Sequence, residues 1–237
     1  MQIWRRSVET GLNVVFPHSC VFCRHVCTQN PAFPGVCRNC LPAVPFRKGN
    51  QTRLESNDEI AVYCATWYSE PIRSAVLRLK FADSPEIATT LAAILLQCCR
   101  QNGLDCRAVA AVPLHPTRQR ERGYNQAALL AARLAASLDK PDWSDQIVRI
   151  RPTDRQSSLP DRMARTINLR NSFALAPETR LNADQFAAPD PELPLLLVDD
   201  ILTTGATLTE AARPFRAIGL PVVGLAVSSD HKSGLSK

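Results

Sequence analysis

Along most of the chain after residue 60, short aliphatic runs alternate with longer segments in which apolar residues recur every three or four positions. The runs predict buried β-strands, because a strand covered on both faces is apolar throughout. The longer segments predict amphipathic helices. We expect strands over residues 60–68, 108–114, 195–198 and 222–227. We expect helices that open at Glu70-Pro71 and at Ser84-Pro85, a helix over Gln126–Leu138, and one from near Thr207 to Gly219 that Pro214 should kink or shorten.

This alternation predicts an α/β domain, in which a mostly parallel sheet carries helices on both faces. Ligands of such sheets bind beyond the carboxyl ends of the strands. The N-terminal part of the chain differs, because it is rich in proline and cysteine and has little helical period outside a short amphipathic segment around residues 3–15. We therefore expect two units, an N-terminal module over residues 1–58 and an α/β domain over residues 59–237.

The 237 residues carry a formal net charge of +6. This charge suits an anionic partner such as a phosphate compound or a nucleic acid. No apolar stretch approaches the roughly 18 residues that cross a bilayer, and the N-terminus lacks the continuous apolar run of an export signal. We therefore expect a cytoplasmic protein without membrane insertion. In that compartment, closely spaced cysteines bind metal more often than they form disulfides.

The stretch LLLVDDILTTGAT at 195–207 carries the strongest chemical signal. Asp199 and Asp200 follow a buried strand, where two charges must meet solvent, a metal ion or a polar ligand. The loop 203–207 then offers threonine hydroxyls, a glycine and the N-terminus of a helix, which together suit a phosphate group. A ribose 5-phosphate fits both ends of such a site. The alternative is a solvated Asp-Asp turn before an ordinary capped helix.

This stretch closely resembles the signature of type I phosphoribosyltransferases. The resemblance implies that Asp199 and Asp200 hold the ribose 2′ and 3′ hydroxyls of phosphoribosyl pyrophosphate (PRPP), often with Mg²⁺, and have the catalytic role. It implies that the 5-phosphate is held by the loop residues Thr203, Thr204, Gly205, Ala206 and Thr207. Purine-using relatives often carry an acid at the position of Thr203, so the acceptor of the phosphoribosyl group is left open.

Three further features are similar to the ComF/GntX family of phosphoribosyltransferase-like proteins: RERGYNQA at 120–127, the spaced RPTDRQSSL segment from residue 151, and the cysteine-rich N-terminus. The resemblance implies a type I phosphoribosyltransferase fold with a small N-terminal zinc module. It implies a pyrophosphate loop formed by Arg122, Gly123, Tyr124 and Asn125. It also implies a flexible loop that includes Arg151, Arg155, Gln156, Arg162 and Arg165.

Both basic segments have other interpretations. Arginines suit pyrophosphate, because a guanidinium binds phosphate oxygens in pairs, but an arginine-rich turn at 118–122 also suits a merely exposed turn. Tyr124 fits a core aromatic equally well. The arginine-rich segment 149–170 fits single-stranded nucleic acid as well as a sugar diphosphate. His115 fits the site, the surface and the core equally.

Two C-x2-C pairs, Cys20 with Cys23 and Cys37 with Cys40, are separated by thirteen residues. Four thiolates at such spacing are typical of a closed tetrahedral Zn²⁺ site with a structural role. The alternatives are inert or disulfide-bonded cysteines and substitute ligands from Cys27, His18 or His25. The remaining cysteines are expected in the core; these are Cys64, Cys98, Cys99 and Cys106.

Two functions follow from these patterns. The first is binding of PRPP or a nucleotide with Mg²⁺, with transfer of the phosphoribosyl group to a nitrogen acceptor that the sequence does not identify. The second is a non-catalytic role, because ComF-type proteins are associated with natural competence. Such a protein would bind single-stranded DNA or a partner in DNA uptake.

Overall fold

The computed structural model describes residues 19–28, 30–49, 53–54, 60–81, 84–151, 169–177 and 192–229. The amphipathic segment expected around residues 3–15 lies outside them. So do His18, Arg155, Gln156, Arg162 and Arg165.

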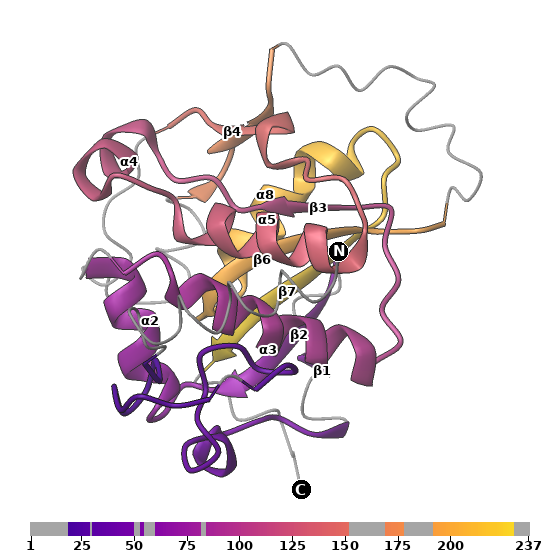
Figure 1. The fold of residues 1–237 in the computed structure, drawn as a ribbon. Coiled ribbons are helices and arrows are strands. Elements are labelled where there is room, and N and C mark those ends of the chain that lie inside the picture. Colours follow the sequence, from indigo (N-terminus) through magenta and orange to yellow (C-terminus); the bar gives the residue numbers. More distant parts are fainter. Residues whose placement is uncertain are drawn as a thin grey trace, which may run out of the picture.

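The main element is a five-stranded sheet with the strand order β1-β2-β7-β6-β3 (Figure 1). Its strands are β1 (Arg53–Leu54), β2 (Ala61–Trp67), β3 (Ala108–Ala111), β6 (Leu195–Leu202) and β7 (Val222–Ser229). β2, β7, β6 and β3 run parallel, and β1 pairs antiparallel with β2 at one edge. The carboxyl ends of the four parallel strands therefore meet along one edge of the sheet.

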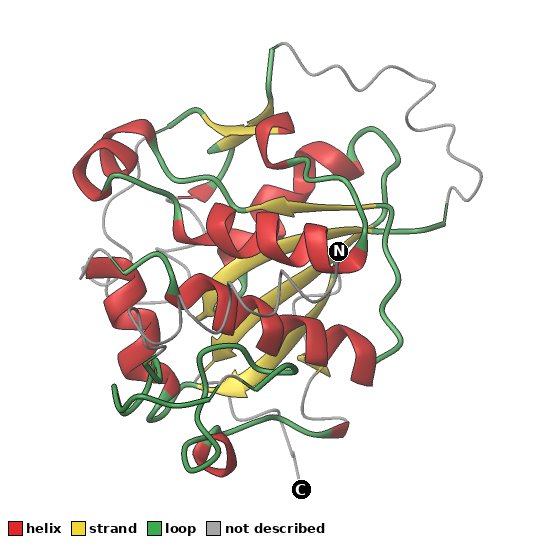
Figure 2. Ribbon diagram, viewed as in Figure 1, coloured by secondary structure: helices red, strands yellow, loops and turns green. Residues whose placement is uncertain are grey.

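Helices cover both faces of this sheet (Figure 2). On one face lie α2 (Ile72–Phe81), α3 (Ile87–Gln101) and α5 (Gln126–Leu138). On the other lie α8 (Ala206–Arg216) and a two-stranded antiparallel sheet of β4 (Ile147–Arg149) and β5 (Phe173–Leu175). The short helix α4 (Pro116–Arg122) and the 3-10 turns η1 (Leu41–Ala43) and η3 (Ser144–Gln146) complete the described elements. The expected α/β class, with a mostly parallel sheet, is confirmed.

The central strand β6 shows why the sheet sequences are continuously apolar. Leu196 and Val198 pack with α2, α3 and α5, whereas Leu195 and Leu197 pack with α8 on the opposite face. All four side chains are fully buried. Because successive residues of a strand point to opposite faces, a strand covered on both sides has no position for a polar residue until it leaves the core.

The elements differ from the expectation in four places. β6 continues through Leu202, because its pairing with β7 continues beyond the apolar run, so the two acids lie within the strand and not after it. β3 ends at Ala111. The basic turn folds into α4, which Pro116 opens and Gly123 ends at a φ of 78°. Two short strands that the sequence analysis does not expect, β4 and β5, border the arginine-rich segment.

The N-terminal module packs directly on α2 and α3. Val21 and Val36 enter the same core cluster as those helices. The Arg78 guanidinium donates a hydrogen bond to the Val21 carbonyl, and the Thr90 hydroxyl donates one to the Pro34 carbonyl. These contacts join the module to the sheet domain through apolar and polar interactions.

A second connection lies at the edge of the sheet. The Arg47 backbone N–H donates to the Ala65 carbonyl of β2 at 2.9 Å. The buried Arg47 side chain stacks 3.6 Å from the centre of the Trp67 ring and donates to the Ser229 carbonyl of β7 at 3.0 Å. β1 also pairs with β2. Residues before position 59 thus contribute to the main sheet, and the boundary at 58/59 stays a prediction.

Candidate functional site

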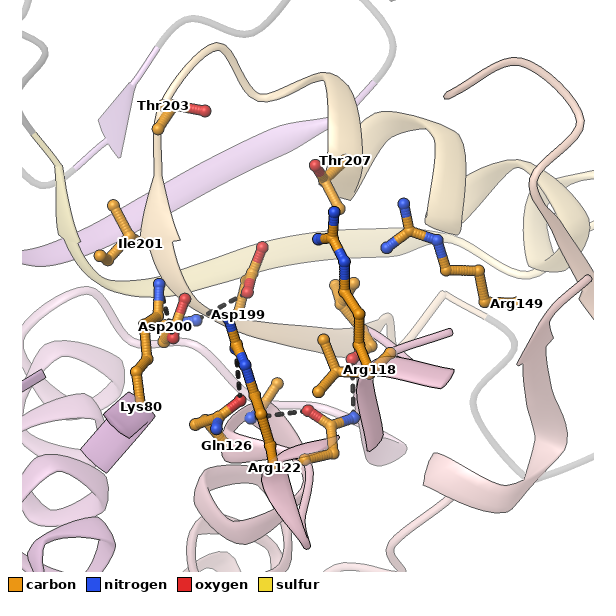
Figure 3. A pocket seen from close by; sticks show the side chains of 14 residues that line it. Lys80, Arg118, Arg122, Gln126, Arg149, Asp199, Asp200, Ile201, Thr203 and Thr207 are labelled. Carbon is orange, nitrogen blue, oxygen red and sulfur yellow. Dashed lines mark hydrogen bonds and ion pairs between the residues drawn. The ribbon is translucent and has the colours of Figure 1, made fainter. Parts of the chain in front are cut away.

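A cavity of about 210 Å³ lies at the carboxyl ends of β6 and β3. Its walls come from α2, α4, α5, α8, β4, β6 and the segments that follow β3 and β6 (Figure 3). Its polar lining residues are Lys80, Arg118, Arg122, Asn125, Gln126, Arg149, Asp199, Asp200, Thr203 and Thr207. Four cations and two acids therefore face one small space, as expected for a site that binds a polar anion.

The acid pair forms one side of this cavity. Asp200 is buried and Asp199 is part-buried. The Asp200 backbone N–H donates to Asp199 Oδ1 at 2.8 Å, and the Lys80 ammonium lies 3.0 Å from Asp200 Oδ2. Burial and the charge of Asp200 together raise the pKa of Asp199 from 3.8 to about 7, although the charge of Lys80 opposes the shift. Lys80 therefore balances an acid pair that would otherwise repel itself.

We expect the pKa of Asp199 to make folding stability fall as the pH rises from about 4 to about 7. Over this range the native carboxyl keeps its proton while the unfolded carboxyl releases it, so the native state binds more protons. In Asp199→Asn the side chain is neutral at every pH, so this variant does not show this fall in folding stability. Urea unfolding at pH 5, 6, 7 and 8 should show Asp199→Asn gaining stability relative to the wild type up to about pH 7 and no further.

Asp105→Asn is the control, because a hydrogen bond from Lys140 lowers the pKa of Asp105, and this group is ionised in both states from pH 5 to 8. A constant difference between Asp199→Asn and the wild type from pH 5 to 8 would contradict the pKa assignment.

The loop after β6 contributes Thr203 and Thr207 to the cavity. Gly205 is buried at a φ of 79° and stands at the N-terminus of α8, a conformation that glycine adopts without strain. The Thr204 hydroxyl accepts a weak hydrogen bond from the Ala206 N–H at 3.4 Å. Thr204, Gly205 and Ala206 do not line the cavity; they shape the turn that places the helix N-terminus beside it.

In the predicted pyrophosphate loop, too, only some of the residues line the cavity. Arg122 and Asn125 line the cavity, and Gly123 ends α4. Asn125 Oδ1 accepts from the Ala127 N–H at 3.0 Å and so caps α5. Tyr124 points away from the cavity and donates from its hydroxyl to the Leu79 carbonyl at 2.6 Å. Tyr124 therefore packs against the hydrophobic core, in agreement with the alternative interpretation of this residue.

Four polar lining residues are not among the predicted site residues: Lys80, Arg118, Gln126 and Arg149. Arg118 and Arg149 stand at the starts of the two basic segments that the sequence indicates. Figure 3 shows the Arg118 and Arg149 side chains on the Thr207 side of Asp199, and Lys80 beside Asp200. Burial and the charge of Arg118 together lower the pKa of Arg149 to about 10, although the charge of Asp199 opposes the shift. The two arginines therefore lie close enough to repel, and an anion between them would relieve that repulsion.

Two other predicted positions do not reach the cavity. Arg151 is exposed and donates a hydrogen bond to the Arg170 carbonyl at 3.4 Å. His115 accepts from the Thr117 N–H through Nδ1 and caps α4. Neither residue lines the cavity.

A second candidate site lies in the N-terminal module, where the four predicted cysteines converge. The Sγ atoms of Cys20, Cys23, Cys37 and Cys40 all lie within 4.8 Å of one another, and the Cys23 and Cys37 sulfurs are 3.7 Å apart. Tetrahedral zinc with Zn–S bonds of about 2.3 Å requires sulfurs about 3.8 Å apart. The cluster therefore could hold a metal ion with the geometry of a structural zinc site.

The electrostatics of Cys20 fit this role. Burial by itself would raise the pKa of its thiol, but hydrogen bonds from the backbone N–H groups of Cys23 and Cys37 lower that pKa to about 6. A lowered pKa favours the thiolate that a metal ion binds. Cys27 and His25 are not members of the cluster.

The remaining cysteines are core residues. Burial raises the pKa of Cys64 and Cys98 to about 12 and that of Cys106 to about 11, which keeps these thiols neutral. All nine cysteines lie in the described residues and are free, so the disulfide interpretation does not apply.

Comparison with known proteins places the chain in a family. It is 32% identical to competence protein F of Haemophilus influenzae over 204 residues, which cover 84% of this chain and 80% of that protein. The chain belongs to the competence protein F family. The DNA utilization protein YhgH of Salmonella typhimurium is 36% identical over 151 residues, and the match spans 62% of this chain and 61% of YhgH. No protein-family model matches the chain.

Structural comparison finds adenine phosphoribosyltransferases. Those of Leishmania tarentolae and Leishmania donovani both align at a TM-score of 0.40, with 11% and 12% identity. The alignments cover 75% and 78% of this competence protein F family member, and 94% and 87% of the two enzymes. In the part of the chain that the structure describes, no helix has the length and apolarity needed to cross a membrane.

Proposed function

We propose that the cavity at the end of β6 binds a sugar phosphate, either PRPP or a nucleotide. The observation that supports this proposal best is the meeting of Asp199 and Asp200 with Arg118, Arg149 and Thr207 in one cavity. Carboxylates accept hydrogen bonds from sugar hydroxyls, whereas guanidinium groups and a helix N-terminus bind phosphate oxygens. The cavity thus offers a hydroxyl side and a phosphate side.

If the protein turns over PRPP, a nitrogen nucleophile attacks C1 of the ribose, the bond from C1 to the pyrophosphate oxygen breaks, and pyrophosphate leaves with the electron pair. The cations of the cavity would stabilise the charge that develops on the leaving group. Thr203 carries no carboxylate to exchange a proton with a purine ring, so we leave the acceptor open. Mg²⁺ would enter as the counter-ion of the diphosphate.

Isothermal titration with PRPP, ribose 5-phosphate and AMP, each with and without Mg²⁺, tests this function. We expect at least one sugar phosphate to bind much more tightly than inorganic phosphate, because only the former engages both sides of the cavity. Equal affinity for inorganic phosphate and for all three ligands, or no heat with any of them, would contradict the proposal.

We also propose that the four-cysteine cluster holds a structural Zn²⁺. Four thiolates fill the tetrahedral shell and leave no position for a substrate. The packing of the module on α2 and α3 supports a stabilising role. Zinc content of the purified protein by mass spectrometry should be one equivalent.

A second function, the handling of single-stranded DNA, has its own support. The relatives are called competence protein F and DNA utilization protein. Near the cavity, the Phe81 side chain is 70% exposed, and the Arg122 guanidinium lies 5.1 Å from the centre of its ring. An exposed aromatic ring beside cations is the arrangement on which single-stranded bases stack.

Phe81→Ala should therefore weaken binding of a short single-stranded oligonucleotide about fivefold or more, since one stacked base contributes roughly 1–3 kcal/mol. Fluorescence anisotropy at low salt measures this affinity. Ile218→Ala removes another exposed apolar side chain and is the control, with no change expected. Equal losses in both variants, or no binding by the wild type at low salt, would argue against the DNA function.

A further inference from the structure

The ion pair between Lys80 and Asp200 is shielded from water more than other ion pairs of the molecule. Its two side chains are only 19% and 10% exposed. Every other ion pair among the described residues has a partner that is 47% exposed or more. Because water screens charges, a shielded pair interacts more strongly than an exposed one at the same distance. The Lys80 ammonium is therefore held firmly against Asp200.

Contacts with neighbouring residues hold the C-terminal end of α2 in position, and they therefore also position Lys80. The Leu79 carbonyl accepts the Tyr124 hydroxyl at 2.6 Å, and the Phe81 ring contacts the Arg122 guanidinium. The residues on both sides of Lys80 are thus tied to the segment that joins α4 to α5. The ammonium is in place beside the acids before any ligand arrives.

The Lys80 ammonium limits which other groups can bind to Asp200. A divalent cation requires carboxylate oxygens as ligands, and Asp200 Oδ2 already has the Lys80 ammonium at 3.0 Å. The ammonium also repels a second cation. Arg118, Arg122 and Arg149 line the same cavity, so four cations already face two acids there. A metal ion would enter surroundings that carry an excess of positive charge.

We propose that Lys80 takes the place of a divalent cation at the acid pair. The chain then neutralises Asp200 itself, and the sugar hydroxyls meet the acids without a metal ion between them. This inference rests on the proposed sugar-phosphate function, since it states how that cavity holds the hydroxyl end of its ligand. Mg²⁺ carried by a diphosphate group would stay at the phosphate end.

Titration of the ligand-free protein with Mn²⁺, followed by electron paramagnetic resonance, tests the inference without any sugar phosphate. The wild type should bind no Mn²⁺ at the acids. Lys80→Met keeps an unbranched side chain one atom shorter than lysine but removes its charge, and it should raise the affinity for Mn²⁺ by at least about tenfold. Adding Asp200→Asn to that variant should abolish the gain.

Lys140→Met is the matched control. Lys140 also lies 3.0 Å from a carboxylate, that of Asp105, but this pair lies outside the cavity. Its replacement should leave Mn²⁺ binding unchanged. A gain as large as that of Lys80→Met would show a general effect of net charge and would overturn the inference.

Ribose 5-phosphate provides a second readout, because it carries no diphosphate to chelate Mg²⁺. Its affinity for the wild type should be the same with and without Mg²⁺, whereas Lys80→Met should bind it more weakly without Mg²⁺ and regain affinity with it. If no sugar phosphate binds, the proposed function fails, and the Mn²⁺ titration still decides the role of Lys80.

Two further results would overturn the inference. One is Mn²⁺ binding by the ligand-free wild type that Asp200→Asn abolishes, which needs no lysine variant and so stands even if Lys80→Met does not fold. The other is a folded Lys80→Met, checked by circular dichroism, that gains no affinity for Mn²⁺.

Discussion

Replacing Cys23 by serine is expected to abolish binding of the proposed structural Zn²⁺ and to lower the stability of the whole molecule, not only of the N-terminal module. Cys23 Sγ lies 3.7 Å from Cys37 Sγ, within the four-sulfur cluster. Loss of a structural metal is one of the few single changes that cost more than about 4 kcal/mol. For a chain of this size, such a loss lowers the melting temperature by about 10 °C.

The loss of stability should extend to the sheet domain, because residues of the N-terminal module belong to the same hydrophobic core as α2 and α3. Val21 and Val36 pack with α2 and α3, and the carbonyls of Val21 and Pro34 accept hydrogen bonds from Arg78 and Thr90. Differential scanning calorimetry should therefore show one transition at a lower temperature. Two separate transitions, with the upper one unchanged, would contradict this coupling.

Cys27→Ser is the matched control, since Cys27 lies in the same module but outside the cluster. It should keep one equivalent of zinc and nearly the wild-type melting temperature. If Cys27→Ser loses zinc as Cys23→Ser does, Cys27 belongs to the ligand set and the four-cysteine assignment is wrong.

The double variant Asp199→Asn/Asp200→Asn should lose sugar-phosphate binding by about a hundredfold or more. Each charged hydrogen bond to a ligand hydroxyl contributes roughly 1.5–3 kcal/mol, and two such losses exceed the roughly 2.7 kcal/mol that a hundredfold change requires. The change also leaves Lys80 without its carboxylate partner, which adds positive charge beside the hydroxyls. Calorimetric titration with the best ligand measures the loss.

The same variant separates the two proposed functions. Binding of single-stranded DNA depends on phosphate contacts, so removing two negative charges should preserve or strengthen it. Asp105→Asn removes an exposed acid outside the cavity and should change neither affinity. A double variant that keeps its sugar-phosphate affinity would remove the acid pair from the proposed site.

The parts of the site that are local in sequence were predictable. The two C-x2-C pairs, the Asp-Asp pair and the threonine loop each lie within a few residues, so spacing alone determines how their groups face one another. The cysteines accordingly converge as the spacing indicates. The helix expected over Gln126–Leu138 also has those bounds in the structure, because Asn125 caps it and its apolar stripe is continuous.

Lys80 and Arg149 are distant in sequence from the Asp-Asp pair, and no motif identifies either one as a residue of this cavity. Lys80 is the penultimate residue of α2, where a lysine is ordinary because the carbonyls at a helix end attract cations. Arg149 ends a strand of only three residues, and the arginine-rich composition around it does not indicate a strand. Their positions depend on how α2 and β4 pack against the carboxyl end of β6, which is a property of the whole fold.

The buried guanidinium of Arg47 connects the N-terminal part of this chain to the main sheet. The Arg47 side chain follows the cysteine cluster in sequence and donates a hydrogen bond to the last residue of β7. β1, which also belongs to the N-terminal part of the chain, forms an edge of the sheet. Shortening the protein to its α/β portion would strip the sheet of an edge and leave the Ser229 carbonyl without this donor. The cysteine-bearing segment is therefore not separable from the sheet domain, because it supplies contacts on which the edge of the sheet depends.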